Sequence, residues 1–480
     1  MDTLLTHWPH IVFIVSAAAG ATAAIHAAMT KNDVRAAIGW VGVILMSPLV
    51  GPILYLIAGI NRVRRGQISQ QRDRALKDYT KIATPVVGDV ARCSAQQFVS
   101  LRVLGDRVSR FPLHDGNHIQ ILTGGDEAYP AMIAAIDAAS ETIGLQTYLF
   151  DDDPEGRKFV DALVRARDRG VEIRVLIDAI GSKYSRPPII ARLRRDGIRA
   201  ALFMTNPLGM KMPYANLRSH RKILVVDGRV GFTGGMNIRA SFVSTVTGNK
   251  TALDTHFRLE GPVVLQLVSV FAHDWEFTTH ETLPMTAWCH DTWNPPEPRV
   301  PARCVRSGPD RSIISTHQML LGAFAVAQRH IRIQSPYFLP DQILLGAINT
   351  AARRGIQVDV VIPGANNLRL INYAMTAQLD QIIRNGCRVW RAAGNFNHSK
   401  LITIDGAWSY VGSSNMDPRS LRLNFELDVE IYSRALASQI EGLIDGQIPA
   451  ARAVTLESLA KIPFGKRLRN KIIWLASPYL

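Results

Sequence analysis

The sequence predicts an α/β protein built from two copies of one unit, preceded by an N-terminal transmembrane hairpin. Three observations support this prediction. Two long uncharged segments lie near the N-terminus, strand-like and helix-like segments alternate after about residue 115, and that alternation returns in the second half of the chain. A chain of 480 residues also exceeds the size at which a single core usually keeps growing, which favours two units.

The first 62 residues are predicted to form the hairpin. Residues 11–29 and 36–60 contain no Asp, Glu, Lys or Arg, and both reach the roughly 20 residues that a membrane-spanning helix needs. A signal peptide is the alternative for the first segment, but its leader MDTLLTH carries no Lys or Arg. A buried helix is the alternative for the second, in which Pro48 and Pro52 leave open a kink or a partly re-entrant shape.

Basic residues predict the orientation of this hairpin and the kind of partner. Arg62, Arg64 and Arg65 open a basic juxtamembrane region, residues 63–115, whereas the link between the two segments offers only Lys31 and Arg35. The positive-inside bias therefore predicts a multi-pass membrane protein whose N-terminus and C-terminal domains are both cytoplasmic. The net charge of +15 indicates an acidic partner, either an anionic membrane or nucleic acid, and the hairpin favours the membrane.

The first predicted unit comprises residues 116–290. Residues 118–124, 141–150 and 170–178 are typical of strands in length and in their β-branched content. The segment EGRKFVDALVRARDRG between the second and third strands has the apolar spacing of a helix. Alternating strands and helices of this kind indicate an α/β fold.

The second unit, residues 291–445, repeats the first. Residues 143–150 correspond to 331–338, residues 165–177 to 349–362, and residues 220–237 to 398–415. Three matches in the same order indicate an internal duplication, so equivalent residues are expected to meet about a pseudo-twofold axis. The last 35 residues, 446–480, form a basic amphipathic segment that is either an interfacial anchor beside anionic lipid or a helix docked on the domain.

Each unit carries the pattern His-x-Lys-x4-Asp, followed by a glycine-containing turn and an asparagine. The first copy comprises His220, Lys222, Asp227, Gly234, Gly235 and Asn237. The second comprises His398, Lys400, Asp405, Gly412, Ser413 and Asn415. The sequences KILVVD and KLITID are typical of strands, so the His and Lys of each copy, two residues apart, project from the same face.

This set of residues suits the cleavage of a phosphodiester without a metal or cofactor. Two lysines, with Asn237, Ser413 and Asn415, can surround the phosphoryl oxygens with positive charge and hydrogen-bond donors. One imidazole can attack phosphorus, while the other protonates the departing alkoxide and later deprotonates the incoming alcohol. No Asp, Glu, His or Cys cluster has the spacing of metal ligands, and the four scattered cysteines form no CxxC pair.

Other interpretations remain for some of these residues. A single His-x-Lys is weak evidence, because such residues are usually solvated, but two copies at matching places strongly favour function. Asp227 and Asp405 belong to the motifs and are candidate catalytic residues, although an Asp-Gly turn also explains them. Asp254 and Glu426, which follow the two motifs, are candidate carboxylates for orienting the histidines.

The motifs resemble those of the phospholipase D superfamily, whose signature is a duplicated HxKxxxxD, and the chain resembles the bacterial cardiolipin synthases over essentially its whole length. The segments that carry this resemblance, besides the hairpin, are NLRSHRKILVVDG, GFTGGMNI, SGPD, SPYFLPD and NHSKLITIDG. The resemblance implies two α/β sandwich domains that share one site and a ping-pong phosphatidyl transfer. Gly235 departs from the superfamily's GSxN, which puts symmetric hydroxyl contacts in doubt.

The resemblance also implies a reaction, a substrate and a location. Two phosphatidylglycerol molecules would give cardiolipin and glycerol, in the inner membrane of a bacterial cell, through a phosphohistidine on His220 with His398 as general acid and base. Anionic membrane lipid is the expected partner, and nucleic acid is not. The alternatives are a membrane-bound phospholipase D hydrolase and a phosphodiesterase or nuclease of the same superfamily.

Overall fold

The computed structural model describes residues 2–31, 33–60, 89–205, 217–290 and 294–477. The chain divides into two compact units, residues 1–64 and 65–480. Most of the predicted basic juxtamembrane region, including Arg62, Arg64 and Arg65, lies outside the described residues. Its last part forms two helices, α5 (Val90–Cys93) and α6 (Phe98–Val108), and the beginning of the first strand.

Within the described residues of the N-terminal unit, one helix is long and apolar enough to cross a membrane. This helix, α1 (Asp2–Thr30), has a mean hydropathy of 1.9 in its segment His7–Thr30. The second predicted span, residues 36–60, is not one helix. It consists of α2 (Val34–Met46), a break, α3 (Val50–Leu54) and one π-helical turn, η1 (Tyr55–Gly59).

Proline explains the break in the second segment. Pro48 has no N–H to donate and restricts the residue before it, and Ser47 accordingly has φ −141° and ψ 73°, outside the helical region. Pro52 lies in the first turn of α3, where a missing N–H costs little. The second predicted span is therefore interrupted, and its observed form corresponds to the kinked or re-entrant shape that the two prolines left open.

The larger unit, residues 65–480, is built on one mixed sheet. Read outward in both directions from the central β9–β1 pair, the strand order is equivalent, except that β16 adds an edge strand to one half. The first half contains, from the centre outward, β1 (His114–Thr123), β8 (Thr255–Glu260), β7 (Val230–Gly234), β6 (Ile223–Val226), β2 (Thr142–Thr147), β3 (Glu172–Asp178) and β4 (Ala200–Phe203). The second half contains β9 (Val300–Ser307), β15 (Asn424–Tyr432), β14 (Trp408–Gly412), β13 (Leu401–Ile404), β10 (His330–Gln334), β11 (Gln357–Pro363), β12 (Arg388–Ala392) and β16 (Arg452–Val454).

Pairing between strands follows the same pattern in both halves. The strands β2, β3 and β4 run parallel to one another, as do β10, β11 and β12, while the motif-bearing strands β6 and β13 are antiparallel to β2 and β10. The two predicted sandwich domains therefore share a single continuous sheet. A short strand, β5 (Arg218–Ser219), lies off this path and pairs with β15.

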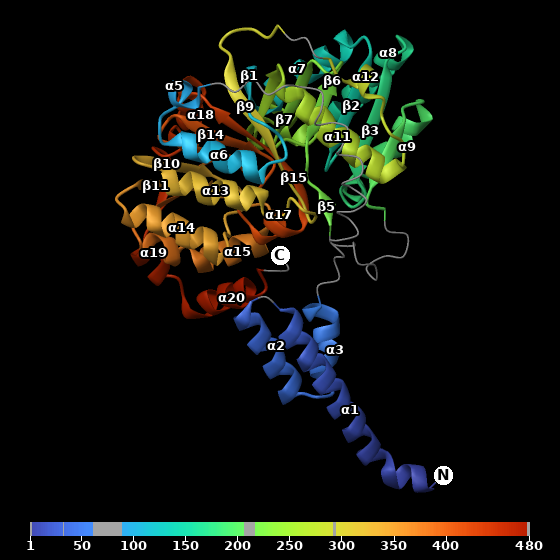
Figure 1. Cartoon of the computed structure of the whole chain (residues 1–480), viewed down its shortest axis with the longest axis vertical. Helices are drawn as coiled ribbons and strands as arrows, with labels where there is room; N and C mark the ends of the chain where they lie inside the picture. Colours follow the sequence, from blue (N-terminus) through green and yellow to red (C-terminus); the bar gives the residue numbers. More distant parts are fainter. Residues whose placement is uncertain (1, 32, 61–88, 206–216, 291–293, 478–480) are drawn as a thin grey trace. The chain divides into compact units, whose positions relative to one another are not determined.

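Helices cover the sheet in both halves (Figure 1). In the first half these are α7 (Gly124–Ala138), α8 (Pro154–Asp168), α9 (Ile189–Arg195), α10 (Ser244–Thr247), α11 (Val263–Thr279) and α12 (Met285–Trp288), with the 3-10 turns η2 (Gly181–Tyr184), η4 (Ala240–Phe242) and η5 (Gly248–Lys250). In the second half they are α13 (Ser315–Val326), α14 (Gln342–Arg353), α15 (Arg369–Gln378), α16 (Asp380–Ile383), α17 (Pro418–Arg422), α18 (Arg434–Asp445), α19 (Leu456–Ala460) and α20 (Phe464–Leu475).

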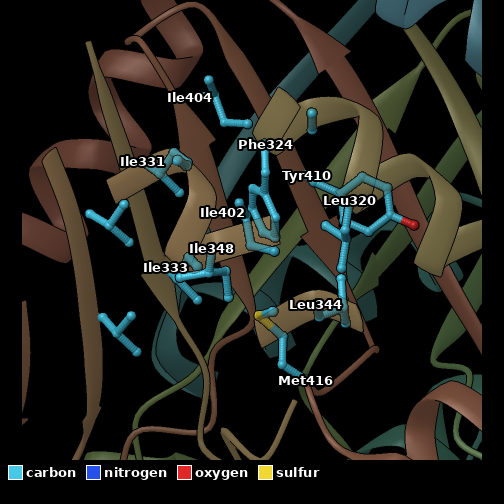
Figure 2. Close-up of a cluster of buried hydrophobic side chains, with 14 of the residues drawn as sticks. Leu320, Phe324, Ile331, Ile333, Leu344, Ile348, Ile402, Ile404, Tyr410 and Met416 are labelled. Carbon is cyan, nitrogen blue, oxygen red and sulfur yellow. The ribbon is translucent and has the colours of Figure 1, made fainter. Parts of the chain in front are cut away.

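The core of the second half shows how periodicity builds these layers. On α13 and α14 the buried residues are four apart, Leu320 with Phe324 and Leu344 with Ile348, while Ile331 and Ile333 alternate along β10 (Figure 2). The helical stripes pack onto one face of the strands, and the first half has a separate, equivalent core. Two cores joined by one sheet place the ends of the two motif strands in a common rigid frame.

Candidate active site

Backbone pairing across the two halves brings the motif histidines together. The amide of His220 donates to the carbonyl of Phe425 at 2.9 Å, where β5 runs parallel to the beginning of β15. In the mirrored position, the amide of His398 donates to the carbonyl of Leu253 at 2.7 Å. Each histidine is thus held by the strand that leads to the candidate carboxylate of the other half.

The two imidazoles face each other, and each is bonded to a carboxylate from the opposite repeat. Their ring centroids are 6.3 Å apart, with an angle of 77° between the ring planes. His220 Nδ1 lies 2.9 Å from Glu426 Oε2, and His398 Nδ1 lies 2.9 Å from Asp254 Oδ2. The sequence suggested both carboxylates as orienting groups, but it did not indicate that the pairs are crossed.

The hydrogen bonds fix the tautomer of both rings. His220 Nδ1 also lies 3.1 Å from the carbonyl oxygen of Ser413, which can only accept, so Nδ1 carries the proton and donates. Burial raises the pKa of the Asp254 carboxylate, but the hydrogen bond from His398, the charge of Lys400 and the amide of Thr255 together outweigh this, and the net pKa is lowered. Asp254 is therefore ionised and accepts from His398 Nδ1, which leaves Nε2 of each ring for chemistry.

Lys222 and Lys400 lie beside the two histidines. Each ammonium donates to the backbone carbonyl of the histidine two residues earlier in its own motif, and Lys400 Nζ is also 3.1 Å from His398 Nδ1. Burial lowers the pKa of Lys222 to about 7 and that of Lys400 to about 8, because a desolvated ammonium is costly. An anion bound between them would offset that cost.

Both histidines have lowered pKa values and are neutral near pH 7. Burial and the charge of Lys400 lower the pKa of His398 to about 3, although the hydrogen bond to Asp254 opposes the shift. Burial and the charges of Lys222 and Lys400 likewise hold the pKa of His220 well below its ordinary value. A neutral imidazole is a competent nucleophile, and an arriving phosphate would raise both values by balancing the lysine charge.

A cavity of about 670 Å³ opens onto both imidazoles. Asn237 and Asn415, the predicted phosphate-binding asparagines, line this cavity. The Oδ1 atom of Asn237 accepts from the amide of Leu149 at 3.1 Å, and this bond orients the side chain. Leu339, Leu368, Ile371 and Phe396 give the cavity an apolar lining that suits the hydrocarbon part of a substrate.

Ser413 does not line this cavity, contrary to its predicted role in binding phosphate. Its hydroxyl donates to Glu426 Oε2 at 2.6 Å and accepts from the amide of Leu427 at 2.9 Å. Because both contacts are inside the protein, we assign Ser413 to holding Glu426. The equivalent Gly235 lacks a side chain because a Cβ there would lie 2.4 Å from Asp254 Oδ1.

Asp227 and Asp405 lie at the far ends of β6 and β13 from the histidines. Asp227 accepts from the amides of Glu141 and Thr142 at 2.8 and 2.9 Å, where β2 begins. Asp405 does the same for β10, accepting from Arg329 and His330. Both residues have positive φ, 50° and 56°. The structure therefore assigns them to turns and strand starts, which corrects the prediction that they are catalytic.

Several residues at the cavity were missed by sequence reasoning. Arg218 and Phe396 line the cavity, and each precedes a motif histidine by two residues. Residues two apart on a strand share a face, as the His and Lys of each motif do, so the same rule could have predicted both residues. Tyr148 and Tyr337 pack edge-on against His220 and His398, with centroids 5.5 and 6.2 Å apart. Among the described residues, no group of three or more His, Cys, Asp or Glu side chains could hold a metal ion.

Comparison with known proteins decides the family. Residues 132–275 and 320–446 match the model of the cardiolipin synthase, PLD-like domain, and residues 20–59 match the phospholipase D-nuclease N-terminal model. The chain belongs to the cardiolipin synthase family. It is 32% identical to cardiolipin synthase A of Pseudomonas entomophila strain L48, over 96% of each chain. It is 30% identical to cardiolipin synthase A of Pseudomonas aeruginosa strain UCBPP-PA14, over 96% of this chain and 94% of that one.

A solved structure supports the fold. Phosphatidylserine synthase of Haemophilus influenzae Rd KW20 superposes with a TM-score of 0.60 at 16% identity, covering 79% of this chain and 100% of that one. At this level of identity the similarity shows the fold alone. Together with the family match, it establishes an α/β protein with two PLD-like domains on one mixed sheet.

Proposed function

We propose that this protein is a cardiolipin synthase that joins two phosphatidylglycerol molecules and releases glycerol. The observation that carries the proposal is the pair of neutral imidazoles, each bonded to a carboxylate of the other repeat, at one cavity with an apolar lining. The full-length similarity of this chain to curated cardiolipin synthases supports the same substrate class.

In the first half-reaction, Nε2 of His220 attacks the phosphorus of the donor lipid. A P–N bond forms, and the bond from phosphorus to the glycerol oxygen breaks. Once the substrate's phosphate balances the lysine charge, His398 takes up a proton at Nε2, and it gives that proton to the leaving oxygen. Lys222 and Lys400 balance the charge on the phosphoryl oxygens. Glu426 stabilises the positive charge that develops on His220, because its carboxylate accepts from the opposite ring nitrogen.

In the second half-reaction, the terminal hydroxyl of another phosphatidylglycerol attacks the phosphohistidine. His398, now neutral, removes the proton from that hydroxyl, and the P–N bond breaks to restore His220. One phosphodiester replaces another, so the transfer needs no nucleotide. Water is the competing acceptor, and its attack would give phosphatidic acid instead.

Membrane attachment is supported by two parts of the chain. The apolar helix α1 suits a single crossing, and we propose the bacterial inner membrane as its location, with the catalytic domains cytoplasmic. The helix α20 exposes Phe464, Leu468, Ile472 and Leu475 along one stripe, while its basic residues suit anionic headgroups. Because α20 also packs on α15, it combines the two roles considered for the C-terminal segment.

The proposal is tested by expression in a bacterial host that lacks cardiolipin. Lipid mass spectrometry should detect cardiolipin with the wild-type chain and none with the double variant His220→Ala, His398→Ala at equal membrane abundance. Accumulation of phosphatidic acid without cardiolipin would instead identify a phospholipase D hydrolase.

Activity should not depend on a divalent metal, because two lysines and two cavity-lining amides supply the charge and donors that a cation would provide. We expect dialysis of the purified enzyme against EDTA to leave the rate of cardiolipin formation in mixed micelles unchanged within twofold. A loss that magnesium restores would contradict this mechanism.

The pH dependence should follow the two lysines. Their pKa values are lowered to about 7 and about 8, so the positive charge that attracts the phosphodiester is present below this range and is lost above it. We expect kcat/KM, which reports the free enzyme, to fall progressively above about pH 8. The lowered pKa of His220 keeps the nucleophile neutral at pH 6, so no comparable loss is expected there. A profile of kcat/KM that stays flat to pH 9.5 would exclude the lysines.

A further inference from the structure

The residues that precede the two histidines make the cavity asymmetric. Arg218 lies two residues before His220, and Phe396 lies two residues before His398; all four line the same cavity. Phe396 lies beside Tyr337, with ring centroids 6.3 Å apart, so this part of the lining is aromatic. Arg419 on α17 adds a second cation to the lining. The cavity therefore has a cationic part that the chemistry described so far does not use.

Arg218 and Arg419 are close enough to affect each other. Burial, together with the charge of Arg419, lowers the pKa of Arg218, while nearby Asp178 opposes this shift. Asp178 itself accepts hydrogen bonds from the amides of Ile180, Gly181 and Ser219, and Asp417 caps α17 by accepting from Ser420. Two neighbouring guanidinium groups in a part-buried cavity favour the binding of an anion.

A third arginine, Arg239, also lines the cavity and forms an ion pair with Asp151 at 2.9 Å. We take the Arg218–Arg419 pair as the candidate anion site because Arg218 lies two residues from His220 and both arginines line the cavity that His220 enters.

The spacing of residues on a strand indicates how far Arg218 lies from the residue that attacks phosphorus. Residues two apart on a strand project from the same face, roughly 6.5 Å apart, so Arg218 lies one such step beyond His220. In cardiolipin, six covalent bonds through glycerol separate the two phosphorus atoms, a span of roughly 6–7 Å given bonds of about 1.5 Å. The long side chain of Arg218 can act over this distance, so it can bind a phosphate that lies one glycerol away from a phosphate at His220.

We propose that Arg218 and Arg419 form a second phosphate-binding subsite, which holds the phosphodiester of the acceptor phosphatidylglycerol. This inference rests on the proposed function and deepens it. The subsite positions the acceptor's terminal hydroxyl at the phosphohistidine, one glycerol away from its own phosphate. Water and free glycerol carry no second phosphate, so they gain nothing from the subsite. The pair therefore favours transfer to a second lipid over hydrolysis.

Two acceptors separate this role from donor binding. The enzyme is given phosphatidylglycerol with isotope-labelled glycerol, so that cardiolipin formation and incorporation of label into phosphatidylglycerol are measured in the same mixed micelles. Both products require the same donor and the same phosphohistidine, but only cardiolipin requires an acceptor with a phosphate. We expect Arg218→Gln and Arg419→Gln each to lower cardiolipin formation about 30-fold, mainly by raising KM for the acceptor lipid, and glycerol exchange less than threefold.

The exchange reaction also shows that each variant is folded. Arg218→Lys, which keeps the charge but not the fork of donors, should give an intermediate loss of cardiolipin formation. Arg195→Gln, an exposed arginine on α9, is the matched control and should change neither product. Equal loss of cardiolipin and exchange in Arg218→Gln would overturn the subsite. A wild-type enzyme that exchanges glycerol without making cardiolipin would overturn the proposed function, and the subsite with it.

A second, independent inference concerns the N-terminal unit. The segment after α2 folds back, so its end lies beside the end of α1. Lys31 donates to the carbonyl of Gly59, and His26 Nδ1 lies 2.8 Å from the hydroxyl of Tyr55. The turn between α2 and α3 packs against the interior of α1 and not against its end. A Cβ on Gly20 would lie 3.6 Å from Pro48 in this turn. Residues 31 and 59 are therefore at the same end of the unit, and residue 48 is not.

We infer that α1 crosses the bilayer once, and that α2 and α3 form a re-entrant hairpin that returns to the side it came from. The predominantly apolar segment of α1 has 24 residues, extends about 36 Å and can span a hydrocarbon core. The 13 residues of α2 extend about 20 Å and cannot. The backbone at the tip is internally bonded, since the amide of Gly51 donates to the carbonyl of Ser47 at 2.6 Å. Polar backbone at such depth is tolerated when it is packed on protein.

The distribution of charge agrees with this topology. A single crossing puts Lys31 and Arg35 on the same side as Arg62, Arg64 and Arg65 in the sequence, whereas two crossings would put them on opposite sides. The leader MDTLLTH, which has no Lys or Arg, then lies on the other side. The positive-inside rule is satisfied more fully by one crossing, with the N-terminus outside the cytoplasm.

Cysteine labelling distinguishes the two topologies. Thr3→Cys and Asp33→Cys are introduced separately into the full chain carrying Cys93→Ser, since the other three cysteines are buried. We expect a membrane-impermeant maleimide to label residue 3 in intact spheroplasts, and residue 33 only in inverted vesicles. The reverse result at both positions would establish two crossings and overturn the inference. The parent Cys93→Ser chain measures background labelling.

Discussion

The His398→Ala variant should form and retain a covalent phosphatidyl-enzyme from a substrate with a nitrophenol-like leaving group, whereas His220→Ala should form none. Such a leaving group departs without a proton, so the reaction needs the nucleophile but not the general acid. With phosphatidylglycerol, both variants should lose activity by about 10⁴-fold or more. His220→Ala lacks the nucleophile, and in His398→Ala a glycerol alkoxide leaves poorly without protonation. Mass spectrometry of the quenched, digested protein would locate the label.

The two histidines differ in the carboxylate that lies behind each ring. This difference supports the assignment of His220 as nucleophile and His398 as general acid. Glu426 behind His220 has a pKa raised by burial, while Asp254 behind His398 has a net lowered pKa. The more strongly ionised Asp254 better stabilises an imidazolium, the form that a general acid needs. Label on His398 in the His220→Ala protein would reverse the assignment, and label on neither histidine in any variant would remove the covalent mechanism.

The Asp254→Asn variant should show a milder form of the His398→Ala defect, although Asp254 belongs to the first repeat and His398 to the second. Its carboxylate accepts from His398 Nδ1, and a neutral amide cannot stabilise the imidazolium in the same way. We expect kcat with phosphatidylglycerol to fall about 10²–10³-fold, and most of that loss to disappear with the nitrophenol-like leaving group. Glu426→Gln, which acts on the nucleophile His220, should lower the rates with both substrates.

The ratio of the two rates therefore tests the crossed pairing itself. If each carboxylate instead served the histidine of its own repeat, Asp254→Asn would lower both rates and Glu426→Gln would be rescued by the better leaving group. Asp227→Asn is the matched control, because its carboxylate bonds the start of β2 and not a histidine. It should lower the melting temperature while leaving the ratio of the two rates unchanged.

Local sequence patterns were sufficient for the fold class and for the central residues of the site. Apolar length predicts α1, and the repeated alternation of strands and helices predicts the two halves, because both signals depend only on neighbouring residues. The duplicated motif identifies His220, Lys222, His398 and Lys400 for the same reason: a strand period of two fixes which side chains share a face.

Other features depend on contacts between residues far apart in the sequence. The amino-acid sequence by itself predicted a duplicated α/β protein with two histidines, two lysines and two candidate carboxylates. Only the tertiary structure decided that Glu426 serves His220 and Asp254 serves His398, because that pairing comes from β5 and β15 meeting across the two halves. It also decided that Asp227 and Asp405 hold strand starts, that Ser413 holds a carboxylate, and that α3 folds back along α1. Each of these outcomes depends on which distant backbone or side chain lies next to the residue.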